Sequence, residues 1–99
     1  MTDQDWPHNP YAGELLVSEF MEPISLTEHA LASASGVDVA RLQAVIAGTE
    51  PINGDLDLRL GRYFGMTEGF FLRLQDEYEL LEAKRALNGD LDRIVPRAA

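Results

Sequence analysis

The chain has 99 residues, enough for one domain, and it contains no cysteine. A disulfide framework, a thiol nucleophile and a zinc site built on thiolates are therefore excluded. No apolar run is long enough to span a membrane, and the acidic, polar first residues do not have the pattern of a signal peptide. We therefore expect a cytoplasmic protein without membrane contact.

The formal net charge of −9 is unevenly distributed along the chain. Residues 1–50 hold eight acidic residues and a single basic residue, Arg41, whereas residues 51–99 hold nine acidic and seven basic residues. A surface of this charge repels nucleic acid and membrane headgroups and attracts basic proteins. The composition therefore favours a basic protein as a partner.

Apolar residues at helical spacing, interrupted by Gly and Pro, predict short helices in the first part of the chain. The first helix is predicted over 10–21, with Asn9 as its cap and with Pro23 ending it. The second is predicted over 27–35 and ends at Gly36, because glycine readily adopts the left-handed conformation found at helix ends.

Three further helices follow from the same spacing. One covers 38–47 with Asp38 as its N-cap, and the next covers 54–64. The last and longest covers 68–87, with Thr67 as its cap. Together these segments predict an all-α fold, a compact bundle of five helices in which a long fifth helix precedes a short C-terminal tail.

The predicted elements divide the chain into an acidic N-terminal arm (1–9), a helical domain (10–89) and a tail (90–99). Within the domain, the second and third helices have the spacing of a helix-turn-helix over about 27–47, with 38–47 as the recognition helix. Helical hairpins with glycine in the turn are common, so this spacing alone does not establish DNA binding.

Four stretches of the chain carry a family resemblance: NPYAGELLVSEFMEP, LTEHALASASGV, GTEPINGDLDLRLGRYFG and MTEGFFLRLQDEYELLEAKR. The last two are the most specific. With these stretches, the chain from Asn9 to Arg97 resembles a HigA-type antitoxin of the lambda-repressor-like (XRE) helix-turn-helix superfamily. The resemblance implies a five-helix DNA-binding fold, a homodimer, an operator upstream of the protein's own operon and, as partner, a ribosome-dependent mRNA endonuclease toxin.

The positions that the resemblance places against DNA are Thr27, Glu28, Val39, Ala40, Arg41, Gln43, Ala44 and Thr49. Only Arg41 and Gln43 offer the donors that read base edges. Relatives usually carry Gln at the position of Glu28, and Lys or Arg near Thr49 and Glu50. Because about one cation per subunit faces the phosphates, we expect operator binding that is weak and sensitive to salt.

Two of these residues have structural alternatives. Glu28 follows Ser25 by three residues, which is the spacing of a Ser-x-x-Glu capping box at the start of a helix. Arg41 lies close enough in sequence to pair with Asp38 instead of reading a base or binding a phosphate.

Other candidates lie outside the predicted DNA site. Arg59 and Arg62 fit a solvated helix face or pairing with Asp55 better than DNA contact. Trp6 in the acidic arm is either without fixed structure or an anchor for a partner. His29 is expected at the surface, where a role as a pH switch has no support from its neighbours.

The fifth predicted helix carries more apolar surface than one small neighbour can cover. Four of its residues repeat at 3-4-3 spacing, and other positions of the helix are apolar as well. Part of this stripe belongs to the core, and its excess length favours a dimer seam. The predicted dimer residues are Phe70, Phe71, Leu74, Tyr78 and Leu81.

These observations predict an antitoxin of a type II toxin–antitoxin system, which neutralises a basic mRNA-cleaving toxin and represses its own operon as a dimer. The alternative is a helix-turn-helix that has lost DNA reading and acts as an acidic protein-interaction module. A third possibility is that the host's proteins are adapted to high salt. Acidic surfaces are then general among them, and this protein binds DNA despite its charge. The chain has no HExxH, GxSxG or phosphate-binding loop, so we predict no catalytic residues, no metal site and no cofactor.

Overall fold

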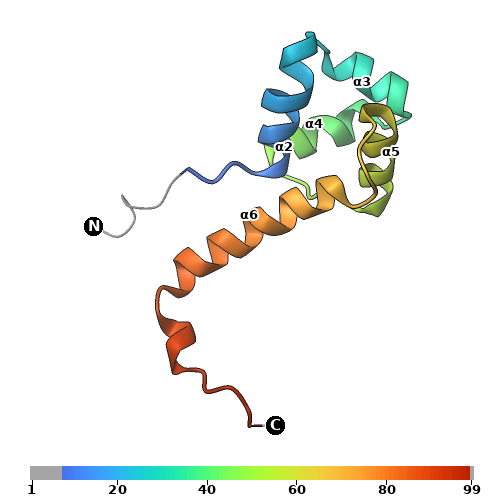
Figure 1. The fold of residues 1–99 in the computed structure, drawn as a ribbon. Coiled ribbons are helices and arrows are strands. Elements are labelled where there is room, and N and C mark those ends of the chain that lie inside the picture. The colour runs from blue at the N-terminus through green and yellow to red at the C-terminus, as the bar shows by residue number, and fades with distance from the viewer. Residues whose placement is uncertain (1–7, 99) are drawn as a thin grey trace.

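The computed structural model describes residues 8–98, and within this range the fold is built from helices without a strand. Figure 1 shows a cluster of short helices from which one long helix runs outward. The elements in order are α2 (Ala12–Leu15), η1 (Leu16–Met21), η2 (Glu22–Ile24), α3 (Glu28–Ser35), α4 (Val39–Ala47), α5 (Gly54–Phe64), α6 (Phe70–Leu87) and η3 (Asp90–Arg93). The prediction of an all-α fold with a long last helix is confirmed.

The first helix begins at Ala12, two residues later than predicted, and Asn9 does not cap it. The Asn9 side-chain amide instead donates hydrogen bonds of 3.0 Å to the backbone carbonyl of Tyr78 and to a carboxylate oxygen of Glu82. Asn9 therefore ties the start of the described chain to α6, a contact that local spacing does not reveal.

The second half of this helix is a π-helix, η1, and not the predicted α-helix. Because π-helical hydrogen bonds join residues five apart, Leu16 and Met21 both point inward and are 0% and 4% exposed. The same winding brings the ring of Phe20 to centroid distances of 5.2 Å from both Phe64 and Phe71. The aromatic core thus accounts for a winding that α-helical periodicity did not predict.

The connection to α3 also differs from the prediction. Pro23 does not end the helix, because a single 3₁₀ turn, η2, continues through it. Ser25 then adopts a left-handed conformation with φ of 54°. Thr27 is the N-cap of α3, and its hydroxyl accepts a hydrogen bond of 3.1 Å from the backbone N–H of Ala30. The predicted capping box of Ser25 and Glu28 is therefore wrong.

The central helices match their predicted bounds closely. Gly36 and Gly48 follow α3 and α4 with φ of 74° and 84°, the left-handed conformation expected at these ends. Asp38 occupies the N-cap position of α4 but makes no side-chain capping hydrogen bond. The last helix begins at Phe70 after Gly69, so Thr67 is not its N-cap.

Helices α2 and α4 cross at very close range. Gly13 in α2 is buried, and a Cβ atom at this position would lie 2.0 Å from the backbone carbonyl oxygen of Val45 in α4. The contact is reinforced by the Tyr11 hydroxyl, which donates a hydrogen bond of 2.7 Å to the carbonyl of Ile46. Only glycine permits this packing of α2 on the helix predicted to read DNA.

A buried carboxylate joins α5 to α6. Asp57 is 2% exposed and accepts hydrogen bonds from three backbone N–H groups at the start of α6, those of Gly69 (2.7 Å), Phe71 (2.8 Å) and Leu72 (3.1 Å). The first N–H groups of a helix have no partner within the helix, and a negative charge there is favourable. Asp57 thus supplies, from a neighbouring helix, the cap that α6 lacks in its own sequence.

Helix α6 is packed at its beginning and open at its end. Phe71 is its one fully buried residue, and the rest of the helix carries the chain away from the cluster (Figure 1). The radius of gyration is 16.6 Å, whereas a compact domain of this length has about 13 Å. No helix within residues 8–98 is both long and apolar enough to cross a membrane.

Candidate nucleic-acid interface

Helices α3 and α4 pack against each other across a short turn and form the predicted helix-turn-helix. Val37 in the turn is partly buried against the core, as its place between two helices requires. The turn is held by Arg59 of α5, whose guanidinium donates hydrogen bonds of 3.2 Å and 3.4 Å to the carbonyls of Ser35 and Gly36. The arrangement of the two helices is therefore set by α5 as well as by their own contact.

Two contacts bring the predicted DNA-binding positions together. Gln43 of α4 reaches Glu28 at the start of α3, and the Thr49 hydroxyl donates a hydrogen bond of 3.1 Å to the Ala44 carbonyl. Ala40, like Gln43 and Thr49, is exposed. The N-terminus of α3, the outer side of α4 and the segment after α4 therefore form one surface, which we call the reading surface (Thr27, Glu28, Ala40, Arg41, Gln43, Ala44, Thr49 and Glu50).

Val39 lies at the border of the reading surface. It was predicted to meet DNA, but its side chain is half-buried and packs partly against the core. The remaining exposed portion is apolar, so its only chemical complement on a base edge is a thymine methyl group.

Arg41 is held by the segment that follows α4. Its Nε lies 3.2 Å from a carboxylate oxygen of Glu50, and its terminal nitrogen donates a hydrogen bond of 2.9 Å to the carbonyl of Pro51. The predicted alternative, pairing with Asp38, is wrong. Glu50 lies nine residues from Arg41 in the sequence, so no local pattern predicts that the two side chains pair.

Gln43 is held in a similar way by the other helix of the motif. Its side-chain nitrogen donates a hydrogen bond of 3.2 Å to a carboxylate oxygen of Glu28. Glu28 therefore faces α4 and does not complete a capping box. Both side chains that offer donors to base edges are thus engaged by a glutamate.

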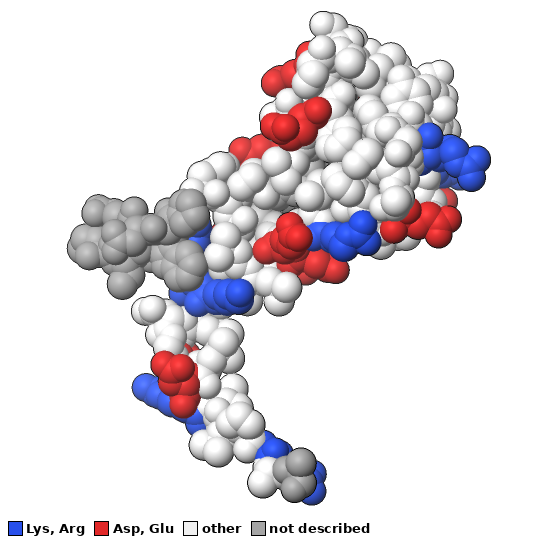
Figure 2. Space-filling view, in the orientation of Figure 1, with Lys and Arg blue, Asp and Glu red and all other residues white. Residues whose placement is uncertain are grey.

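The electrostatics of the reading surface are unfavourable for phosphate. Arg41 is the only Lys or Arg between residues 8 and 58, and its charge is balanced by Glu50. In the view of Figure 2, the surface over α2 carries acidic side chains, whereas acidic and basic side chains are mixed over α5 and α6. Backbone amides at the N-terminus of α3 remain as donors for a phosphate.

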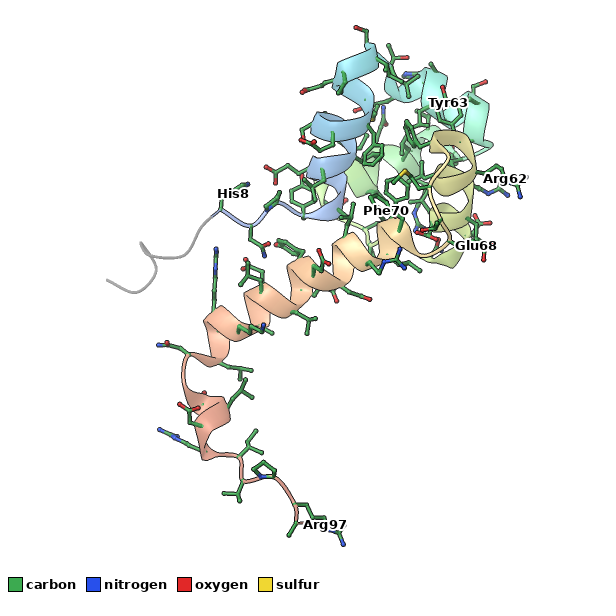
Figure 3. The ribbon with its side chains drawn as sticks, viewed as in Figure 1. His8, Arg62, Tyr63, Glu68, Phe70 and Arg97 are labelled. Carbon is green, nitrogen blue, oxygen red and sulfur yellow. The ribbon has the colours of Figure 1, made fainter. Side chains whose placement is uncertain are left out.

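The other predicted charged residues lie away from the reading surface or are engaged. Arg59 forms the predicted pair with Asp55, with Nε 3.1 Å from the carboxylate. Arg62 is exposed on α5, and Figure 3 shows its side chain directed outward, away from the helices. His29 is exposed on α3 as expected, and Trp6 lies outside the described residues.

The predicted dimer residues lie along the first part of α6, and the structure corrects one of them. Phe71 is 0% exposed and belongs to the core of its own chain, so it is not available to a second copy. Phe70 is half-buried against Phe20 and Phe71, with ring centroids 5.8 Å and 5.1 Å away. Leu74 is partly buried against the core.

After Leu74, the apolar side chains of α6 are half-buried or exposed. Tyr78 and Leu81 are half-buried, with Tyr78 edge-to-face against Tyr11. The sequence prediction missed the residues farther along, because their exposure follows from the outward course of α6. The apolar residues left exposed from the middle of α6 onward, here called the C-terminal arm, are Leu80, Leu87, Leu91, Ile94 and Val95.

Comparison with known proteins places this arrangement in a family, although no protein-family model matches the chain. Virulence-associated protein I of Dichelobacter nodosus is 36% identical over 75 residues, which are 76% of this chain and 69% of that protein. A Pseudomonas aeruginosa protein solved with 18 base pairs of its operator DNA is 31% identical, with a TM-score of 0.83 over 93% of this chain and 98% of that one.

The Pseudomonas aeruginosa antitoxin HigA, solved with the higBA promoter, is 28% identical, with a TM-score of 0.78 over 93% of this chain and all of the other. An addiction module antidote protein of the HigA family from Coxiella burnetii is 27% identical, with a TM-score of 0.81 over 93% of this chain and all of the other. The helix-turn-helix of α3 and α4, the long α6 and the near full-length matches agree with one another. The chain belongs to the HigA-type antitoxins, a family of XRE helix-turn-helix proteins.

Proposed function

We propose that this antitoxin binds operator DNA upstream of its own operon through α3 and α4, as a homodimer, and thereby represses the operon. The observation that carries the proposal is the near full-length match to chains solved with operator DNA. The reading surface adds chemistry to it, since Arg41 and Gln43 have the donors for guanine and adenine edges.

The toxin half of the proposal is supported by charge. A toxin that cleaves mRNA needs a cationic surface to hold RNA, and a partner with a net charge of −9 competes with RNA for that surface by charge and by steric exclusion. A short, basic reading frame beside the gene is the arrangement that this proposal requires.

The alternative function is an acidic protein-interaction module that no longer reads DNA. It is favoured by one specific observation: Glu28 and Glu50 engage the two donors of the reading surface. The two functions differ in whether the protein prefers its own upstream DNA to a scrambled duplex.

We expect specific but weak binding to the upstream DNA in a fluorescence-anisotropy titration. The complex should form at about 50 mM salt and be lost near about 150 mM, because few phosphates are neutralised by each subunit. A scrambled duplex of equal length is the control. A tight, specific complex at the higher salt would contradict the expected weakness, and equal affinity for both duplexes at low salt would favour the interaction module.

The proposed homodimer is supported by the C-terminal arm. Leu80 on α6 is 61% exposed and Val95, which follows η3, is 85% exposed, and large apolar side chains left exposed in this way are typical of an interface. A second copy of the chain is the occupant that the family resemblance implies, and it covers both arms by symmetry. Phe70, Leu74, Tyr78 and Leu81, which lie on the same helix as Leu80, are partly exposed.

Leu80→Glu is expected to weaken the dimer at least about tenfold, because it places a charge in an apolar interface. The matched control is Leu58→Glu, which changes a leucine that is 51% exposed on α5. Light scattering over a dilution series measures the effect. A wild-type monomer at all concentrations, or equal effects of the two substitutions, would refute the proposed interface.

A further inference from the structure

We propose that Glu28 and Glu50 are specificity-determining residues, which suppress sequence-independent DNA binding by holding Gln43 and Arg41 in the free protein. The inference rests on the operator-binding function proposed above. It names the residues by which the protein discriminates the operator from other DNA.

The Arg41 contact joins two opposite charges. The Arg41 Nε lies 3.2 Å from a Glu50 carboxylate oxygen, an ion pair without a hydrogen bond, and the terminal nitrogen donates a hydrogen bond of 2.9 Å to the Pro51 carbonyl. The Arg41 side chain is 31% exposed, so the pair is shielded on one side by the protein. Any DNA phosphate that takes Arg41 must therefore displace a carboxylate that is already in place.

The Gln43 contact acts through a neutral group. Glu28 lies in the first turn of α3 and accepts the hydrogen bond of 3.2 Å from the Gln43 amide. The carboxylate stands at the helix terminus where backbone N–H groups bind a phosphate. A DNA backbone that approaches α3 therefore meets a negative charge before it meets these amides.

The two contacts oppose DNA of every sequence, because the phosphate charge is the same in all of them. The free energy lost when the two glutamates are displaced is regained only at base edges. Arg41 can form two hydrogen bonds with a guanine, and Gln43 can form two with an adenine. Interactions that disfavour the wrong partner raise specificity even when they lower affinity. The reading surface therefore binds DNA that lacks the matching bases only weakly.

The test compares E28Q and E50Q with wild type on the upstream duplex and on a scrambled duplex. We expect each substitution to raise affinity for scrambled DNA about five- to tenfold at low salt, and to raise affinity for upstream DNA less. The matched control is Asp92→Asn, which removes the same charge in η3; Figure 1 shows this segment far from α3 and α4.

The salt dependence separates the two residues. E50Q frees a guanidinium, so its log–log slope on scrambled DNA should become steeper by about 0.9 per additional phosphate contact. This steepening should disappear when Arg41→Ala is added. E28Q removes a negative charge but leaves an oxygen that can accept from Gln43, and it gives no such dependence on Arg41. Equal thermal midpoints for the variants and wild type show that the fold is unchanged.

Three results would overturn the inference: no gain on scrambled DNA, an equal gain on both duplexes, or an equal gain from Asp92→Asn. A wild-type protein without preference for upstream DNA would overturn the operator function. In that case E28Q and E50Q would gain equally on both duplexes, so the specificity role of the two glutamates would fall together with the operator function.

Discussion

Replacing Asp57 with alanine is expected to lower the free energy of unfolding by about 3 to 5 kcal/mol. The substitution leaves three backbone N–H groups at the start of α6 without their acceptor, and that of Phe71 is buried. It also removes the negative charge that stabilises this helix terminus. Urea-induced unfolding followed by circular dichroism measures the change.

The matched control is Asp76→Ala, at an exposed position of α6. It removes the same side chain from a solvated site, and we expect a change within about 0.5 kcal/mol. If Asp57→Ala were no more destabilising than this control, the carboxylate would not be the cap of α6. The amide variant Asp57→Asn should fall between the two, because one of its side-chain atoms can no longer accept a hydrogen bond.

Replacing Gly13 with alanine is expected to destabilise the fold by about 2 to 4 kcal/mol. The added Cβ would meet the Val45 carbonyl oxygen at 2.0 Å, and backbone atoms cannot turn aside as a flexible side chain can. Helix α2 must therefore move away from α4, which also weakens the hydrogen bond from Tyr11 to Ile46. The midpoint of thermal or urea unfolding reports this loss.

Gly54→Ala is the control for the glycine substitution. Gly54 is the first residue of α5, and a Cβ there meets no atom within 4 Å. Alanine at such a site should leave stability unchanged or raise it by about 0.4 to 1 kcal/mol, because it restricts the unfolded chain. Similar destabilisation by both substitutions would mean that the α2–α4 crossing does not depend on the size of residue 13.

Some helices have the bounds that the sequence predicts. These helices carry a capping residue or a glycine at their ends. Helix α5 has its predicted bounds of Gly54–Phe64, and Asn53 caps it by accepting a hydrogen bond of 3.0 Å from the Leu56 N–H. Gly36 and Gly48 end α3 and α4 in the left-handed conformation. A cap or a glycine acts on residues within one turn, so neighbouring letters of the sequence are sufficient to predict it.

The sequence predicts that the candidate DNA-binding residues lie on α3, on α4 and just after α4, but it does not predict which side chains they contact. Position followed from the resemblance and from the spacing of the helix-turn-helix. The partners of Arg41 and Gln43 did not, because Glu50 and Glu28 reach them only after α3, α4 and the following segment have packed. Phe71 shows the same limit for the dimer stripe, since aromatic rings from η1, α5 and α6 surround it within its own chain.

By itself, the sequence determined the all-α class, the helix-turn-helix, the family and the acidic charge, because each depends on composition or on contacts within one or two turns. The tertiary structure decided which groups meet across the fold: Asn9 with Tyr78, Asp57 with the start of α6, and Arg59 with the end of α3. Such pairs join residues that are 12 to 69 positions apart. Their geometry is fixed only when the helices pack, and no local pattern records it.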